Sequence, residues 1–314
     1  MPGRGWWIGA AVLSFASAAH AGLYAKAGWE AHMPLGSHQS RGTATIIDDH
    51  TIQIEDFYYD GGGISVYFYL GAANTSSAFS SGLQIGPQLL GTTFSGDSLT
   101  LTLPGGESLD DYSAISVWCV VAGVSFTSAS FAPPGTTYDR AGAVADINGI
   151  FHSVDATATI INDHLIHVEH FTYDGGAPAV YFYLGADNTD SAFLDGLELP
   201  PHLDRAYADE SLVLTVPSAE NLDDYTAISV WCAQFHVNFG SAVFIMLDPA
   251  DADGDGDVDL ADHAAFVGCM AGAGSAPNAG SLSAQQCLDA FDADVDGDVD
   301  LADEARMQRV FTGP

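Results

Sequence analysis

The first 250 or so residues of the chain consist of short β-branched and aromatic runs separated by clusters of Gly, Asp, Asn and Pro. Such runs, bounded by turn-forming residues, are typical of β-strands. No window of ten or more residues in this part shows a helical period. The predicted strands of its first half are 43–47, 51–57, 66–70, 98–103 and 115–119. The pattern predicts an antiparallel β-sandwich or barrel.

The same pattern occurs twice along the chain. Residues 43–79 and 157–193 are identical at 26 of 37 positions without a gap. A repeat of about 100 residues has the size of a domain rather than of a solenoid unit. We therefore predict a mainly β fold with two tandem antiparallel β-sandwich domains. Their predicted bounds are 28–132 and 140–246.

Four motifs recur in the same order in both copies: a histidine before the first strand, Tyr-Asp-Gly-Gly, Val-Tyr-Phe-Tyr-Leu-Gly and a terminal Ser-Val-Trp-Cys. They lie at His38 and His152, at 59–62 and 173–176, at 66–71 and 180–185, and at 116–119 and 229–232. In these motifs each copy resembles a DM13 domain, a relative of the DOMON β-sandwiches. The resemblance implies an extracellular role in electron transfer that centres on one cysteine per domain, here Cys119 and Cys232.

The residues themselves leave the role of these cysteines open. Ile115 and Cys119 share a strand face, which favours a buried cysteine packed as a small apolar side chain. A reactive thiolate is the second interpretation and needs a cationic or metal neighbour, for which His38 and His152 hold equivalent positions. A disulfide with Cys232 is the third, although interior strands of two sandwiches lie farther apart than a disulfide spans. A haem or other redox cofactor also stays open.

Other catalytic patterns are absent from the sequence. His164, His167 and His170 recur at every third position, so they alternate between strand faces, and we predict that they mostly face solvent. No pair of catalytic carboxylates, nucleophile elbow, phosphate-binding Gly loop or HExxH helix is present. We favour a role that is not enzymatic, with redox activity of the repeated domains as the open alternative.

A second duplication lies near the end of the chain. Segments 251–262 and 292–303 place Asp at positions 1, 3, 5, 7, 9 and 12 and Gly at position 6. A calcium loop needs oxygen ligands at these positions and Gly for its sharp turn. Many carboxylates in a compact loop also need cations to offset their repulsion. The predicted ligands of two Ca²⁺ ions are Asp251, Asp253, Asp255, Asp257, Asp259, Asp262, Asp292, Asp294, Asp296, Asp298, Asp300 and Asp303.

Apolar residues at helical spacing follow each loop, and position 12 is Asp rather than the Glu of an EF-hand. Two such loop-helix units resemble a type I dockerin domain over residues 248–314. The resemblance implies an α-helical attachment module that docks on a cohesin-like or other surface or scaffold partner. Loop positions 10 and 11, which help choose the cohesin, are often small polar residues in dockerins. Here they are Leu260, Ala261, Leu301 and Ala302, which we predict as partner contacts and which place a standard cohesin in doubt.

The N-terminal pattern predicts export. Residues 1–21 combine a charged start, a short apolar run and an Ala-His-Ala cleavage site, as a signal peptide does. We therefore expect a secreted or cell-surface protein with no transmembrane segment. In an oxidising compartment we also expect a disulfide between Cys269 and Cys287, which would brace the small C-terminal module.

The charge of the chain restricts its partners. The net charge is −34, and only seven residues are Lys or Arg. This balance argues against nucleic acid and against anionic membranes as partners. The sequence thus predicts an exported binding and display protein anchored through calcium. The alternatives are an extracellular electron-transfer protein and, more weakly, a component of a polysaccharide-degrading complex.

Overall fold

The computed structural model describes residues 24–149, 151–246, 248, 250–252, 258–278, 280, 282–293 and 296–311. The chain divides into two compact units, one spanning residues 23–246 and the other containing residues 247–314. The predicted signal peptide, residues 1–21, lies outside the described residues. None of the helices described is both long and apolar enough to cross a bilayer.

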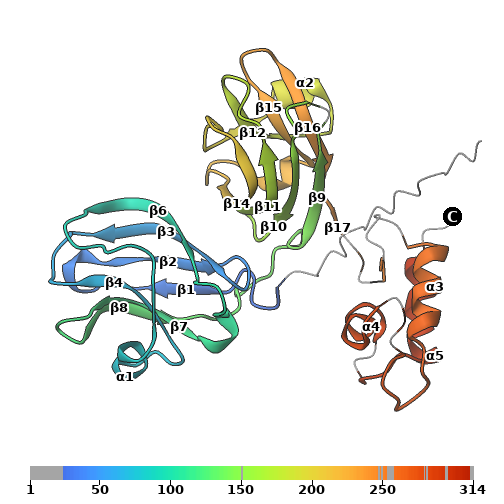
Figure 1. Cartoon of the computed structure of the whole chain (residues 1–314), viewed down its shortest axis with the longest axis horizontal. Helices are drawn as coiled ribbons and strands as arrows, with labels where there is room; N and C mark the ends of the chain where they lie inside the picture. The colour runs from blue at the N-terminus through green and yellow to red at the C-terminus, as the bar shows by residue number, and fades with distance from the viewer. Residues whose placement is uncertain are drawn as a thin grey trace, which may run out of the picture. The chain divides into compact units, whose positions relative to one another are not determined.

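The first copy forms two antiparallel four-stranded sheets, with the strand orders β1-β2-β3-β6 and β5-β4-β7-β8 (Figure 1). The strands are β1 (Glu30–Met33), β2 (Arg41–Ile46), β3 (Thr51–Tyr59), β4 (Val66–Gly71), β5 (Leu83–Ile85), β6 (Phe94–Thr102), β7 (Ala114–Cys119) and β8 (Val124–Ser130). Short helical turns join them: η1 (Ser37–Gln39), α1 (Ser76–Ser80) and η2 (Leu109–Asp111). All five predicted strands of this copy are present, with ends shifted by up to four residues.

The second copy repeats these sheets and adds one edge strand, giving the orders β14-β11-β10-β9-β17 and β13-β12-β15-β16. The strands are β9 (Ala143–Asn148), β10 (Asp155–Ile160), β11 (Leu165–Tyr173), β12 (Val180–Gly185), β13 (Leu197–Leu199), β14 (Tyr207–Thr215), β15 (Ala227–Cys232), β16 (Val237–Val243) and β17 (Ile245–Met246). Its helical turns are α2 (Asp190–Leu194) and η3 (Leu222–Asp224). The mainly β fold with two tandem sandwich-like domains is thus confirmed.

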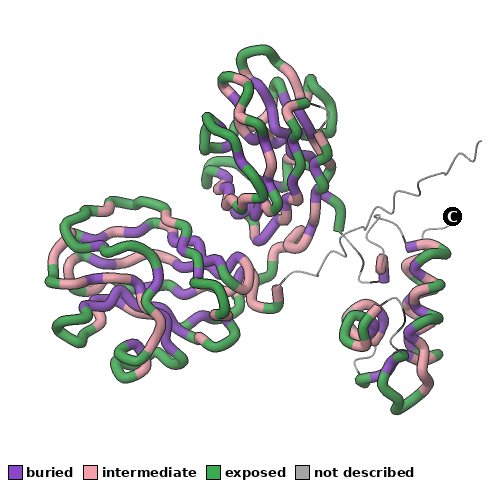
Figure 2. Tube along the Cα trace, viewed as in Figure 1, coloured by how far each residue is buried: buried purple, intermediate pink, exposed green. Residues whose placement is uncertain are grey.

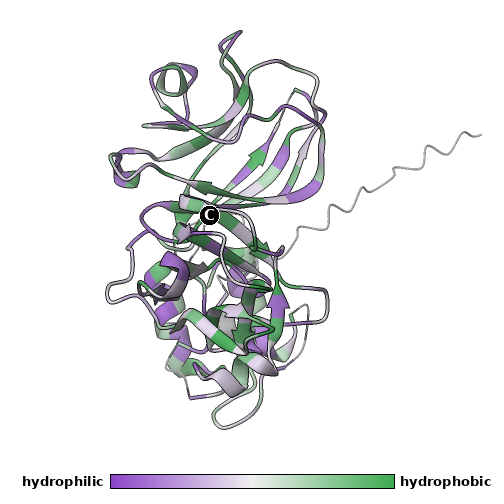
Figure 3. Ribbon diagram, turned by 90° about the vertical axis from the view of Figure 1, so that its left-hand side faces the viewer, coloured by the Kyte–Doolittle hydropathy of each residue, from purple (hydrophilic) through white to green (hydrophobic). Residues whose placement is uncertain are grey.

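Each sandwich has its own core between its two sheets. Hydrophobic and hydrophilic residues alternate along the strands, as the colours of Figure 3 show. In β4, for example, Val66, Phe68 and Leu70 point inward and the residues between them are partly exposed. Figure 2 shows the buried positions concentrated in the strands and the exposed ones in the loops. Burial of one strand face is the main apolar driving force for this fold.

A smaller apolar cluster covers the outer face of β7 and of β15. Trp118 packs against Phe79 of α1 with ring centroids 6.0 Å apart, and Trp231 packs against Phe193 of α2 at 6.1 Å. Because both faces are covered, all six residues of each of these strands are buried. The strands that carry the two free cysteines are therefore central and closed on both sides.

The C-terminal unit is helical and small. Its described helices are α3 (Leu260–Cys269), α4 (Ala284–Phe291) and α5 (Leu301–Val310). They pack around a core that includes Phe266, Phe291 and Met307, and a disulfide joins Cys269 of α3 to Cys287 of α4. α3 and α5 lie where the apolar spacing predicts helices. The sequence prediction did not include α4, although Ser283 and Gln286 form a capping box at its start.

Candidate functional site

The two free cysteines end the strands β7 and β15 at equivalent positions. Cys119 pairs with Val66 of β4, and Cys232 pairs with Val180 of β12. Both side chains are buried in the core of their own sandwich, as the alternation of the strand predicts. Because each thiol lies in a separate core and remains free, the alternative of a disulfide between them is wrong.

The pKa of the Cys119 thiol is lowered by the backbone around it. Burial raises the pKa of this thiol, but hydrogen bonds from four backbone groups outweigh burial, so that the net pKa lies below its usual value. The donors are the N–H groups of Ile64, Ser65, Val121 and Ala122. Each N–H carries a partial positive charge, so the four together stabilise a thiolate without a charged side chain. Two of these N–H groups belong to the loop before β4 and two to the turn after β7; we call the four together the Cys119 cradle.

The second sandwich lacks one of these donors. Pro178 occupies the position of Ile64, and proline has no backbone N–H. The Cys232 thiol instead donates a hydrogen bond to the carbonyl oxygen of Pro178, with a sulfur–oxygen distance of 3.2 Å. A hydrogen bond donated by a thiol stabilises its protonated form. Two strands with the same six residues therefore end in two different thiol environments.

His38 and His152, which the hypothesis of a reactive thiolate considered as cationic neighbours, each pack against an aromatic cluster. The Nδ1 atom of His38 lies 3.0 Å from Asp60 Oδ1, and its ring centroid lies 4.5 Å from that of Phe126. Tyr59 contacts this cluster, and its ring centroid lies 6.5 Å from those of His38 and Phe126. The equivalent residues of copy two are His152, Asp174, Phe239 and Tyr173.

Tyr59 connects this cluster to the cysteine. Burial, the charge of Asp60 and the charge of a Cys119 thiolate together raise the pKa of Tyr59 to about 12. The phenol is thus neutral at physiological pH and donates a hydrogen bond to the carbonyl oxygen of Gly62. The partly exposed His38 and the rings of Tyr59 and Phe126 thus form one aromatic cluster.

A second candidate site lies where the two sandwiches meet. A pocket of about 400 Å³ is lined there by Asp48, from the turn between β2 and β3, and by His167 and Glu169 of β11. The Nε2 atom of His167 lies 3.5 Å from Asp48 Oδ2, and its Nδ1 atom lies 3.7 Å from Glu169 Oε2. Burial lowers the pKa of His167 more than the two carboxylates raise it, so the ring is neutral near pH 7.

The prediction that the three histidines face solvent is wrong for His167, which is only 2% exposed. The first sandwich covers this part of β11, which strand alternation within one domain does not reveal. His170 is exposed, as expected, and pairs with Asp209. His164 is half-buried, and its Nε2 atom lies 3.0 Å from Glu55 Oε2 of the first sandwich.

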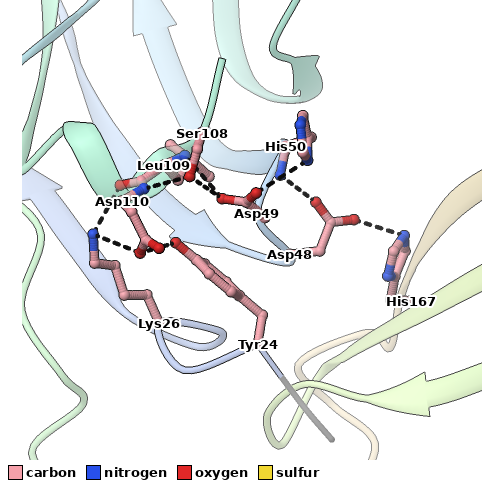
Figure 4. A network of polar contacts seen from close by, with 9 residues as sticks. All are labelled: Tyr24, Lys26, Asp48, Asp49, His50, Ser108, Leu109, Asp110 and His167. Carbon is pink, nitrogen blue, oxygen red and sulfur yellow. Dashed lines mark hydrogen bonds and ion pairs between the residues drawn. The ribbon is translucent and has the colours of Figure 1, made fainter. Parts of the chain in front are cut away.

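A polar network fixes the turn that presents Asp48 (Figure 4). Asp49 Oδ1 accepts hydrogen bonds from the Ser108 hydroxyl at 2.6 Å and from the Leu109 N–H at 3.1 Å. Asp48 Oδ1 accepts a hydrogen bond from the His50 N–H at 2.6 Å. With Oδ1 engaged in this way, Asp48 directs its second oxygen, Oδ2, towards His167. The turn is therefore held in place before any ligand binds.

Equivalent residues of the two copies also make the apolar part of this contact. Ile47 and Ile161, which match in the alignment of the copies, share one small buried cluster with Leu165. The hydrogen bond to Glu55 raises the pKa of His164 to about 9, against the effect of burial and with help from Asp163. His164 is therefore charged at neutral pH and forms an ion pair across the contact.

The second predicted calcium loop is described at all of its aspartates except Asp294. Asp298, Asp300 and Asp303 each bring one carboxylate oxygen within 4.8 Å of the others. Asp303 Oδ1 accepts a hydrogen bond from the Ala293 N–H at 2.7 Å, which ties the two ends of the loop together. Asp292 accepts hydrogen bonds from the N–H groups of Asp296 and Gly297.

In the first predicted loop, Asp253, Asp255 and Asp257 lie outside the described residues. The described part matches the second loop: Asp262 Oδ1 accepts a hydrogen bond from the Ala252 N–H at 2.6 Å, and Asp259 begins α3 with a capping box, as Asp300 does for α5. The predicted partner contacts, Leu260, Ala261, Leu301 and Ala302, are all exposed.

Comparisons with known proteins agree with the repeated sandwiches. The family model described as "Electron transfer DM13" matches residues 34–131 and again residues 147–244. Protein Skeletor, isoforms B/C, from Drosophila melanogaster is 30% identical over 212 residues, which cover 65% of this chain and 27% of that protein. Isoforms D/E match at 30% identity over 14% of their length, so the chain spans about a quarter or less of these relatives.

No solved structure matches the chain. The family model nevertheless covers more than half of it and coincides with both sandwiches and both free cysteines. The chain belongs to the DM13 family, with two tandem DM13 domains.

Proposed function

We propose that this chain is an electron-transfer protein in which Cys119 is the group that gives and takes electrons. The proposal rests on the lowered pKa of the buried Cys119 thiol, which hydrogen bonds from backbone N–H groups bring about against the effect of burial. A thiolate is the reactive form of cysteine, and a lowered pKa makes that form available near neutral pH. Cys232, which donates a hydrogen bond to the Pro178 carbonyl oxygen, serves as a buried structural residue.

The test compares the two cysteines in the full-length protein. Alkylation by iodoacetamide at pH 7 is measured for C119S, which keeps Cys232, and for C232S, which keeps Cys119. We expect C232S to react at least about 10-fold faster, because the reaction rate follows the thiolate fraction. Equal and slow reaction of both variants, together with a colourless protein, would leave the sandwiches as display or binding modules. A visible absorption band in the purified protein would instead indicate a bound haem or other redox cofactor.

A second proposal concerns the C-terminal unit, which would anchor the protein through calcium. The two loops share the same hydrogen-bonded ends and the same capping boxes, and three carboxylates of the second loop already converge. Leu260 and Leu301 are 63% and 70% exposed at equivalent positions, as apolar partner contacts would be. These features support a dockerin-like module over residues 248–314 that binds two Ca²⁺ ions and docks on a cohesin-like or other surface partner.

Calorimetric titration of the full-length protein with Ca²⁺ tests this anchor. We expect about two ions per chain, and a loss of helical circular dichroism on addition of EDTA, because a loop crowded with carboxylates needs cations to stay compact. D303N should remove one ion and D262N the other, whereas D209N, an exposed carboxylate of the second sandwich, should change neither. Absence of binding would contradict the anchor and leave the proposal for Cys119 untouched.

Secretion is part of the same proposal. The protein would reach the cell exterior after removal of residues 1–21, and the disulfide between Cys269 and Cys287 suits an oxidising compartment. Export of the full-length protein and N-terminal sequencing of the exported form test this directly. A mature N-terminus at Gly22 is the expected result.

A further inference from the structure

An unpartnered nitrogen lies at the contact between the two DM13 domains. His167 is 2% exposed, and within the described part of the chain its Nε2 atom has no hydrogen-bond partner. Native proteins rarely leave a buried polar atom unsatisfied, so such an atom calls for an explanation such as a water or an ion. The pocket into which it faces also presents two carboxylates. We propose that Asp48, His167 and Glu169 form a binding site for a divalent transition-metal ion such as Zn²⁺.

The distances suit such an ion. Each of the three residues offers one ligand atom, and these atoms all lie within 4.8 Å of one another. In a tetrahedral zinc site with bonds of about 2.0–2.1 Å, neighbouring ligand atoms are about 3.3 Å apart. His167 Nε2 and Asp48 Oδ2 are 3.5 Å apart, close to that spacing. Glu169 Oε2 lies 3.7 Å from the other ring nitrogen, Nδ1, so the Glu169 side chain, which is 42% exposed, has to turn to complete an ion site at Nε2.

The chemistry of the donors selects the class of metal. Imidazole nitrogen and carboxylate oxygen together suit Zn²⁺ and similar first-row ions, whereas Ca²⁺ and Mg²⁺ prefer oxygen ligands alone. The pocket of about 400 Å³ has room for water to complete the coordination, as in zinc sites with an open position. The site thus differs in kind from the all-oxygen calcium loops of the C-terminal unit.

The turn of Asp48 is built to hold this ligand. Its Oδ1 atom is engaged by the His50 N–H, and the neighbouring Asp49 is fixed by Ser108 and Leu109 (Figure 4). Hydrogen bonds of this kind orient a metal ligand and lower the cost of ordering it. The second oxygen of Asp48 points to His167, so the pair needs little rearrangement to close on an ion.

The contact brings together Asp48 of the first copy and His167 of the second, and this ligand set is not repeated by the matching positions. Asn162 of the second copy matches Asp48, and Gln53 of the first copy matches His167. Elsewhere in the contact His164 and Glu55 pair with each other. The proposed site therefore arises from two differences between otherwise similar copies. Because its ligands come from both domains, a bound ion would also link the first sandwich to the second.

The experiment is a Zn²⁺ titration of the full-length protein with its calcium loops kept saturated by excess Ca²⁺. H167Q and D48N each introduce the residue that stands at the equivalent position of the other copy, which makes them conservative for the fold. H170Q, on the same strand but exposed and outside the pocket, is the matched control. We expect one Zn²⁺ per chain, weakened at least about 10-fold in H167Q and in D48N and unchanged in H170Q.

Co²⁺ in place of Zn²⁺ supplies an independent readout, because nitrogen ligation in a low-symmetry site intensifies its visible absorption. This band should appear in the wild type and in H170Q and be lost in H167Q. Since H167Q alters a buried residue, its unfolding in EDTA is compared with that of the wild type. D48N, at a partly exposed position, keeps the test valid if H167Q folds poorly. Absence of Zn²⁺ binding, or binding that both H167Q and D48N retain in full, would overturn the proposal.

Discussion

The two DM13 domains of this chain have the same strands and the same central hexapeptide, yet their cysteines differ. Cys119 lies among four backbone N–H groups, and Cys232 donates to the carbonyl oxygen of Pro178. One substitution, Ile64 in the first domain against Pro178 in the second, removes one donor and accounts for part of the contrast. The comparison teaches that a conserved fold and an identical strand do not fix the chemistry of a thiol. The backbone of the adjacent loop contributes to it directly.

The largest predicted effect tests what the two domains share. A Cβ atom on Gly82 would lie 1.9 Å from the Leu70 carbonyl oxygen, and one on Gly196 would lie 2.1 Å from the Leu184 carbonyl oxygen. We expect G82A and G196A each to destabilise its own sandwich by about 3 kcal/mol, because backbone atoms must shift. Denaturant unfolding of the full-length protein measures both.

G105A is the control for this pair, since nothing lies within 4 Å of a Cβ atom at Gly105. It should change stability by less than about 0.5 kcal/mol. A large cost in one domain and none in the other would show that the two sandwiches are not equivalent at this turn.

The next effect separates the histidine clusters of the two domains. A Cβ atom on Gly62 would lie 2.3 Å from His38 Nδ1, whereas one on Gly176 would lie 3.0 Å from His152 Nδ1. G62A must therefore displace the histidine ring and should cost about 2 kcal/mol, and G176A about 1 kcal/mol. Differential unfolding of the two variants measures the gap. Equal losses of unfolding free energy would mean that the wider spacing between Gly176 and His152 does not affect stability.

The third effect exchanges the residues that distinguish the cysteines. I64P removes one N–H from the Cys119 cradle, and P178I returns one to the surroundings of Cys232. A hydrogen bond to a charged group contributes about 1.5 kcal/mol, so alkylation of Cys119 near neutral pH should slow up to about 10-fold in I64P. P178I should have the opposite effect and speed alkylation of Cys232. I64V, which keeps the N–H, is the control.

The pH dependence of Cys119 belongs to the same test. Its pKa is lowered in the folded protein, so the thiolate contributes stability above the unfolded value, near pH 8.5, and loses it as the pH falls through the folded pKa. The alkylation rate of Cys119, measured in C232S, should accordingly persist to lower pH than that of a free thiol such as glutathione. A pH profile identical to that of glutathione would contradict the lowered pKa of Cys119.

The smallest effect concerns the ion pair between the domains. The pKa of His164 is raised to about 9, so its contribution to stability is fully present below about pH 6.5 and is lost as the pH rises through 9. His164 is partly exposed, and the loss should be at most about 1 kcal/mol. Unfolding at pH 6 and pH 10 measures it, and E55Q should abolish the His164 part of the difference. An unchanged pH dependence in E55Q would assign that difference to other groups.

Alternation and turn residues revealed most of the sandwich fold in advance. The strands around Val66–Gly71 and Ala114–Cys119 lie where the apolar alternation places them, and Gly61 and Gly175 of the Tyr-Asp-Gly-Gly motifs take a positive φ, which glycine adopts without strain. The sequence did not predict β1, β5 and β8. β1 and β5 have only four and three residues, which give too little periodicity, and β8 consists largely of small polar residues. The only local signal of α4 is the capping box of Ser283 and Gln286, because a helix of eight residues shows little more than two turns of periodicity.

The duplication, the sandwich class and the burial of Cys119 and Cys232 follow from the amino-acid sequence alone, because repeats, alternation and turn residues are local properties of the chain. Which backbone groups act on each sulfur, and that Asp48 meets His167 across two domains, depends on how the sheets pack in three dimensions. Residues more than a hundred positions apart come together through the packing of whole sheets. No local sequence pattern shows that such residues are neighbours. The two copies do differ at both positions of the Asp48–His167 site, where the other copy has Asn162 and Gln53.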